Sequence, residues 1–562
     1  MSAAASSQQP AACSLQPAAN SQQPTANSQQ PAGLRSRLIL FAGRTSQALA
    51  RLYFDIAPLL AADPRLSVAW ALIPGSRFES GSYEFAEGAG IDLLPWTASR
   101  RLRPALVITS SPDPCLYEVD APVLSLPHGA GHNRLRPELS GVSGLSPEQI
   151  QGPNGEVPDF MALPGPAAAR RLAIDCPTAV SNAAVTGDVC LERLRTSAVR
   201  RDDFRRALGV EPHQRLVVLS STWDQNALTR SNRTLPERLL AELPMDEYRL
   251  AFIPHPNDEV ADTPRPTGFL RPYLENGLVM IPPEEGWRAT LVAADCLIGD
   301  HGSVTYMGAT IGLPVLLAAF GFANMPRESP LARFGRIAPR FDRSTPAAPQ
   351  IRRAIESGPV DFDYADALAE PDTPPSARIT QRACELLGIE PAAPTGPEHL
   401  PTPDLLPRCL PTSAWHCRID PEAATWSRHP ASVPSSGPGH LVADLACRDP
   451  RLRDSASVLL LHRDPVPASA AVETLRSILD KQPVCRVASA RTAADEASVV
   501  IRDGMSLRVR TDPRRMDLLP SALYAATAPD GSSPLRLDAV HALDLLRRFD
   551  PGLALLAAED RP

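Results

Sequence analysis

The chain has 562 residues, of which 43% are hydrophobic, and its formal net charge at pH 7 is −7. This length predicts two to four domains, and the acidic balance argues against a general nucleic-acid-binding protein. No run of 18 apolar residues occurs, so the sequence contains no candidate membrane span. Lys481 is the only lysine, which excludes a Walker-type phosphate loop from residues 1–480 because that loop requires a lysine.

The cysteines and the N-terminal segment indicate a cytosolic protein. The ten cysteines form no CxxC motif, so we expect free thiols, no disulfide framework and no metal site. The N-terminus lacks a basic region followed by an apolar core, and no secretory signal is expected. Residues 1–33 repeat a short Ala, Asn, Ser, Gln and Pro pattern without charge, which predicts a disordered tail.

Short apolar segments alternate with helix-like segments from residue 34 onward. This alternation predicts parallel sheets that are covered by helices on both faces. We place one doubly wound domain at 34–200 and a second at 201–390. The predicted strands of the first are 38–42, 67–73, 105–109 and 122–126, and those of the second are 216–220, 249–253, 278–281, 296–298 and 315–319.

The remainder of the chain is predicted to form a linker and a third folded part. Residues 391–440 contain 11 prolines and are interpreted as a linker. Residues 441–562 are predicted to form a small α/β module, with strands at 457–461, 498–501 and 507–509. No catalytic motif is evident in this module, so we interpret it as an interaction or regulatory unit.

Polar side chains follow four of the predicted strands, where ligands bind in open α/β sheets. The most informative segment, 297–317, is a strand, a small polar turn, a helix and a second strand. Its turn would present backbone N–H groups and hydroxyls at a positive helix terminus, which suits a diphosphate. The four loops are Pro127-His128-Gly129, Ser221-Thr222-Trp223-Asp224, Pro254-His255-Pro256 and Asp300-His301-Gly302-Ser303.

In this order the four loops resemble the motifs of the CDP-glycerol glycerophosphotransferase family, over roughly residues 120–320. The family builds or extends teichoic-acid-type polymers on a GT-B fold, in which two Rossmann-like domains face each other. His301 stands where Tyr is usual in the family, and Gly302 stands where its first Ser is usual. The resemblance therefore implies a nucleotide-diphosphate donor and leaves the identity of that donor open.

The resemblance also implies a role for each matching residue. His128 would be the base that deprotonates the acceptor hydroxyl, and His255 would steady the leaving diphosphate or act as an acid. Arg134 would contact the acceptor or a phosphate in place of a lysine, and Thr222 and Trp223 would bind the nucleotide. The residues expected to bind the donor diphosphate are Gly129, Asp300, His301, Gly302, Ser303 and Thr305.

Three functions remain open from the sequence. The first is a cytoplasmic transferase that moves glycerophosphate or a sugar to a polyol-phosphate or glycan acceptor, with or without peripheral contact at the inner face of the membrane. The second is a UDP-sugar glycosyltransferase or epimerase-like GT-B enzyme. The third is an inactive GT-B-like scaffold that carries an interaction module. None of the three implies a cofactor beyond the nucleotide-activated substrate, a metal or a nucleic-acid partner.

Overall fold

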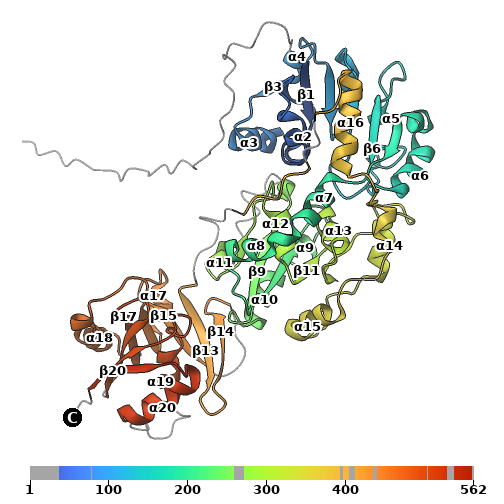
Figure 1. Ribbon diagram of the computed structural model, residues 1–562. Helices are drawn as coiled ribbons and strands as arrows, with labels where there is room; N and C mark the ends of the chain where they lie inside the picture. Colours follow the sequence, from blue (N-terminus) through green and yellow to red (C-terminus); the bar gives the residue numbers. More distant parts are fainter. Residues whose placement is uncertain are drawn as a thin grey trace, which may run out of the picture.

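The computed structural model describes residues 37–76, 79–258, 271–392, 396–403, 412–433, 439–502, 504–527 and 537–559. Three sheets organise these residues (Figure 1), and we call the regions around them the first domain, the second domain and the C-terminal module. The disordered tail predicted for 1–33 lies outside the described residues. Within the described part of the chain, no helix is long and apolar enough to cross a bilayer.

The first domain is built on a seven-stranded parallel sheet with the order β3-β2-β1-β4-β5-β6-β7. Alternate residues of β1 lie in different apolar clusters, Ile39 and Phe41 in one and Leu40 and Ala42 in the other, so the sheet is buried on both faces. The strands are β1 (Arg37–Gly43), β2 (Leu66–Leu72), β3 (Leu93–Pro95), β4 (Leu106–Thr109), β5 (Val123–Ser125), β6 (Phe160–Leu163) and β7 (Ala183–Val185).

Short helices connect these strands. The helix after β1 contains a π-helical stretch, so that α1, η1 and α2 form one continuous segment. The helical elements are α1 (Ser46–Arg51), η1 (Leu52–Ile56), α2 (Ala57–Ala61), α3 (Glu79–Ala89), α4 (Trp96–Ser99), η2 (Pro114–Glu118), α5 (Pro147–Ile150), α6 (Pro166–Asp175) and η3 (Pro177–Asn182).

The second domain has a five-stranded parallel sheet with the order β10-β9-β8-β11-β12. Alternate residues of β8 again lie in different apolar clusters on the two faces, Leu216 and Val218 in one and Val217 and Leu219 in the other. The strands are β8 (Arg215–Ser220), β9 (Tyr248–Ile253), β10 (Val279–Met280), β11 (Cys296–Gly299) and β12 (Val315–Leu317).

Helices cover both faces of this sheet as well. They are α7 (Val189–Thr196), η4 (Ser197–Arg200), α8 (Arg201–Ala207), α9 (Leu228–Ser231), α10 (Leu235–Glu242), η5 (Pro256–Asp258), α11 (Arg271–Leu274), α12 (Trp287–Ala293), α13 (Ser303–Thr310), α14 (Pro330–Ile337), α15 (Ala347–Ser357) and η7 (Tyr364–Asp366).

The helix that closes the second domain in sequence, α16 (Pro375–Leu387), returns to the first domain (Figure 1). Its buried residues Ile379, Ala383 and Leu387 belong to the same apolar cluster as Ile39 and Phe41 of β1. The chain therefore returns to the first domain after it has formed the second, and Leu400 then packs in the core of the second domain again. The predicted pair of doubly wound domains in a GT-B arrangement, followed by an α/β module, is confirmed.

A buried cluster of charges joins the two domains beside this crossing. The Asp55 carboxylate, on η1, pairs with Arg51 of α1 at 2.7 Å, with Arg193 of α7 at 2.7 Å and with Arg288 of α12 at 2.9 Å. Arg51 also pairs with Asp188 at 2.7 Å, and all these side chains are buried. Burial alone would raise the pKa of Asp55, but the three guanidinium groups outweigh it and lower the pKa to about 2.

The C-terminal module contains an eight-stranded mixed sheet with the order β14-β13-β15-β16-β17-β18-β19-β20. The strands are β13 (Ala414–Asp420), β14 (Thr425–Pro430), β15 (His440–Asp444), β16 (Val458–Leu461), β17 (Val487–Arg491), β18 (Glu496–Ile501), β19 (Ser506–Arg510) and β20 (Ala554–Glu559). The helices are α17 (Pro450–Asp454), α18 (Ala468–Lys481), α19 (Leu519–Thr527) and α20 (Ala539–Phe549).

The predicted linker at 391–440 is wrong in part, because β13 and β14 form a hairpin within it. Only one of its prolines, Pro421, lies between residues 412 and 429, and it stands between the two strands. The hairpin also attaches the module to the second domain. Arg428 of β14 pairs with Asp246 at 2.7 Å, and its carbonyl accepts the Met245 N–H at 2.9 Å.

Candidate active site

The predicted polar loops lie at the carboxyl ends of the strands, and loops of the first and second domains contact each other directly. A Cβ atom added to Gly129, after β5, would lie 2.7 Å from the Ser303 hydroxyl at the start of α13. The Leu135 N–H of the first domain donates to the Asn324 carbonyl of the second at 2.8 Å. The structure therefore brings the His-Gly loop and the Asp-His-Gly-Ser loop to one interdomain boundary.

His128 follows β5 and is neutral near pH 7. Its side chain has a solvent-exposed surface, but the protein groups around it displace much of its hydration. This loss of hydration is the largest cause of its lowered pKa. A backbone hydrogen bond with Ser110 opposes that shift, and the positive charges of Arg51 and Arg134 add to it. A neutral, exposed imidazole has a lone pair available, so His128 has the state that a proton acceptor requires.

His255 follows β9 between two prolines, and both of its ring nitrogens have partners. The Asn257 N–H donates to Nδ1 at 3.1 Å, and the side-chain amide of Gln47, on α1, lies 2.6 Å from Nε2. Burial lowers the pKa of His255 to about 3, and the charges of Arg134 and His128 act in the same direction. His255 is therefore neutral in this state and offers a hydrogen bond, not a second proton.

Arg134 and Trp223 form a contact that also spans the two domains. The guanidinium carbon of Arg134 lies 4.8 Å from the centroid of the Trp223 ring, within the range of a cation–π interaction. The same indole ring lies 6.2 Å from the His255 ring, at an angle of 43°. The Arg134 charge lowers the pKa of both His128 and His255, which shows how closely these groups gather.

The Asp300 carboxylate is turned away from solvent and holds the loops together. It accepts the N–H groups of Thr222 at 2.8 Å, Leu228 at 2.9 Å and Gly302 at 2.9 Å, and its exposed fraction is 0%. Burial raises its pKa, while His301 and these N–H groups oppose the shift. The predicted direct contact of Asp300 with a diphosphate does not fit this geometry, since both oxygens are already engaged. The backbone N–H of Thr222 is used in this way to hold the loop after β8 against Asp300.

His301 bridges two loops of the second domain. Its Nε2 lies 2.9 Å from the Asp224 carboxylate, and its Nδ1 is 3.3 Å from the Gly321 backbone nitrogen. Burial disfavours the charged ring, but the hydrogen bond to Asp224 and the charges of Asp300 and Asp224 outweigh burial and raise its pKa. His301 is therefore more easily protonated than His128 and His255, whose pKa values are lowered.

Helix α13 begins at the interdomain boundary, but only some of its residues that were predicted to bind the diphosphate face that boundary. Gly302 is the N-cap, and Ser303 is exposed opposite Gly129. Thr305, in contrast, is 1% exposed, and its hydroxyl packs against Gly299 of β11 without a hydrogen-bond partner. Thr305 is two residues beyond Ser303, about half a helical turn, so its side chain points toward the sheet and away from the boundary, and a contact with a diphosphate stays a prediction.

Two features of the structure are absent from the sequence prediction. Gln47 contacts His255 from the other domain, although a single Gln at a helix start forms no motif. In the C-terminal module, His462 Nδ1 lies 2.6 Å from Asp517 and His462 Nε2 lies 2.8 Å from the Ser489 hydroxyl. This row of three side chains resembles a catalytic triad. Ser489, however, is 0% exposed, and Asp517 is the member that faces solvent, so substrate cannot reach the Ser489 hydroxyl in this arrangement.

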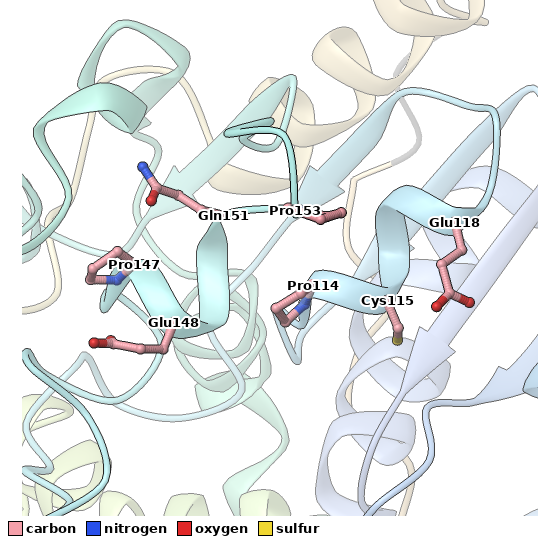
Figure 2. A pocket seen from close by; sticks show the side chains of 8 residues that line it. Pro114, Cys115, Glu118, Pro147, Glu148, Gln151 and Pro153 are labelled. Atoms are coloured by element: carbon pink, nitrogen blue, oxygen red, sulfur yellow. The ribbon is translucent and has the colours of Figure 1, made fainter.

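A hollow of about 560 Å³ lies in the first domain between η2 and α5 (Figure 2). None of the predicted site residues lines it. Burial raises the pKa of the Cys115 thiol, so this group is a poor nucleophile, and Glu118 is paired with Arg100 at 3.1 Å. The residues around it are Pro114, Cys115, Glu118, Pro147, Glu148, Gln151, Gly152 and Pro153.

The sequence matches no protein-family model and no curated protein. Among solved structures, the chain is similar to the wall teichoic acid polymerase TagF, with 12% identity and a TM-score of 0.39 over 63% of this chain and 88% of that chain. It is also similar to UDP-GlcNAc 2-epimerase from Neisseria meningitidis, with 10% identity and a TM-score of 0.36 over 62% and 100%. Similarities at this level indicate no activity or ligand for this chain.

Proposed function

We propose that the protein is a transferase that moves a glycerophosphate or sugar group from a nucleotide-diphosphate donor to an acceptor hydroxyl. One observation carries the proposal: His128 and Arg134 of the first domain meet Trp223, His255 and Ser303 of the second at the carboxyl ends of both sheets. Ligands bind at this edge in open α/β sheets, and a boundary between two such edges suits a two-substrate reaction.

The proposed reaction divides the work between the two domains. The acceptor hydroxyl gives its proton to neutral His128 as its oxygen forms the new bond to the transferred group. The old bond to the nucleotide breaks, and its electron pair leaves with the nucleotide phosphate. His255 Nε2–H, the N-terminus of α13 and the Ser303 hydroxyl then donate to the leaving phosphate, while Arg134 balances its charge.

His301 has a distinct role in this proposal. Because its pKa is raised by Asp224 and Asp300, a phosphate nearby would favour the protonated ring further. The imidazolium would then stabilise the donor diphosphate, at a position where Tyr is usual in the family. The same proposal includes a polyol-phosphate or glycan as the acceptor. It also includes a cytoplasmic location, with peripheral contact at the inner face of the membrane.

Replacement of His128 tests the proposal. His128→Ala is expected to reduce donor turnover at least about 100-fold, the usual contribution of a positioned acid or base, while nucleotide binding stays within about threefold of wild type. His213→Ala, at an exposed position after α8, is the matched control. Product formation is measured with CDP-glycerol, CDP-ribitol, UDP-sugars and GDP-sugars in turn.

The same screen separates the other two functions. A donor that is converted without any acceptor would indicate an epimerase-like or hydrolytic enzyme. Wild-type turnover by His128→Ala would remove the proposed base and with it the mechanism. Nucleotide binding without conversion of any donor would favour an inactive scaffold.

A further inference from the structure

We infer that Gln47 is a positioning residue of the candidate active site, which keeps the Nε2 hydrogen of His255 directed across the domain boundary until an oxygen of the donor replaces the Gln47 amide. The inference rests on the proposed function, because it assigns His255 to the donor phosphate. It means that a residue of the first domain orients His255, which belongs to the second domain and is one of the motif residues.

The position of Gln47 is well fixed. It is the second residue of α1, whose N-terminus is capped by the Thr45 hydroxyl through the Ala48 N–H at 3.3 Å. Four residues later, Arg51 enters the buried charge cluster with Asp55 and Asp188. Because Asp55 also binds Arg288 of the second domain, α1 is attached to both domains at its far end. Gln47 therefore projects from a helix that cannot shift independently of the interdomain contact.

The hydrogen bonds of His255 determine which atom carries its hydrogen. Nδ1 accepts the Asn257 N–H, so the hydrogen of the neutral ring is on Nε2, 2.6 Å from the Gln47 amide nitrogen. The amide oxygen and nitrogen of a Gln exchange places by rotation about the last side-chain bond. With the oxygen turned toward the ring, Nε2–H donates to Gln47 Oε1, and the hydrogen of the neutral His255 ring has an acceptor.

A donor phosphate offers the same kind of acceptor as the Gln47 amide oxygen, with a negative charge in addition. Charge-assisted hydrogen bonds are about twice as strong as neutral ones, so a phosphate oxygen is favoured over Gln47 at Nε2–H. Once displaced, the Gln47 amide can rotate and donate its own N–H to the same phosphate. Gln47 thus keeps His255 correctly oriented in the free protein without blocking the donor.

The contact between Gln47 and His255 can be measured through the pKa of His255, which responds to nearby charges. Arg134 and His128 lower its pKa together with burial, and Asp224 opposes them. In Gln47→Glu, a carboxylate takes the place of the amide beside Nε2. An opposite charge at this distance favours the protonated ring, so the pKa of His255 is expected to rise from its lowered value. A residue that does not contact the His255 ring would not move this value, and the loss of kcat/KM in Gln47→Leu then tests the positioning role.

The test is an imidazole NMR titration of the full chain, with steady-state kinetics on the same samples. Wild-type His255 is expected in the Nε2–H form, and Gln47→Glu is expected to raise its pKa. Gln47→Leu is expected to lower kcat/KM for the donor about 3- to 10-fold, the effect of one lost neutral hydrogen bond. The control is Gln381→Leu, an exposed Gln on α16 that bonds Glu385 at 3.0 Å, which should leave both readouts unchanged.

The two readouts separate failure of the inference from failure of the proposed function. If the pKa of His255 is unchanged in Gln47→Glu, the contact does not exist in solution and the inference is overturned. If the pKa moves but no donor is ever converted, the proposed function fails while the contact stands. Wild-type kcat/KM in Gln47→Leu, with transfer observed, would also overturn the positioning role.

Discussion

The charge of Arg134 affects the pKa of several titratable residues in the candidate active site. It lowers the pKa of His128, His255 and Asp224, and it lies over the Trp223 ring. Removal of a nearby positive charge in Arg134→Gln should raise the pKa of both histidines. The acidic limb of the pH–rate profile should therefore move to higher pH, and nucleotide binding should weaken and depend less on salt. Arg136→Gln, whose side chain pairs with Glu138, is the control, and identical pH profiles for the two variants would contradict this account.

Ser489 gives a second prediction at the scale of one residue. Its hydroxyl is fully buried and bonds His462 at 2.8 Å, so we interpret it as a structural group. Ser489→Ala leaves a buried ring nitrogen without its partner, which is expected to lower the free energy of unfolding by about 1–3 kcal/mol. Transferase activity should be retained below the unfolding transition. Covalent labelling of native wild-type protein at Ser489 by a serine-hydrolase probe would instead indicate an open nucleophile.

At the scale of elements, the loop after β5 and the N-terminus of α13 approach each other as closely as their residues permit. Gly129→Ala would place a methyl group 2.7 Å from the Ser303 hydroxyl, and this overpacking is expected to cost about 1–3 kcal/mol of stability. Gly129→Ala combined with Ser303→Ala leaves an ordinary distance of 3.5 Å to the Ser303 Cβ, so thermal unfolding should return close to that of Ser303→Ala. Strictly additive losses in the double variant would show that the loops do not touch.

The positions of the elements were predictable from the sequence, whereas the directions of several side chains were not. His128 and His255 follow apolar strands, and the carboxyl ends of parallel strands meet at one edge, so their loops could be assigned to one site. Asp300 lies in a correctly predicted turn and Thr305 in the helix that follows it, but the Asp300 carboxylate accepts backbone N–H groups and the Thr305 hydroxyl faces the sheet. Gln47 has no local signal, because its partner is 208 residues away.

At the scale of the whole molecule, the Asp55 cluster determines how the two domains are joined. Asp55→Asn leaves three arginines facing each other in a buried site, and the loss of one member of such a network typically costs about 3–5 kcal/mol. The pKa of Asp55 is lowered to about 2 from a normal value of 3.8, so its contribution is complete above about pH 4 and is lost as the pH falls toward 2. The control is Asp120→Asn, at an exposed position.

Denaturant unfolding at pH 7 and pH 3 tests this contribution. The difference in stability between wild type and Asp55→Asn should be largest at pH 7 and smaller at pH 3, and Asp120→Asn should follow wild type at both. An equal difference at both pH values would show that the ionised carboxylate is not what stabilises the interdomain cluster.

The most direct test of the transferase proposal is isothermal titration calorimetry of the wild-type chain with CDP-glycerol, CDP-ribitol, UDP-sugars and GDP-sugars. At least one of them is expected to bind with one site per chain, and Arg134→Gln is expected to weaken this binding while Arg136→Gln does not. If none of these nucleotides binds the wild-type protein, the interdomain boundary is not a nucleotide site and the transferase proposal is contradicted.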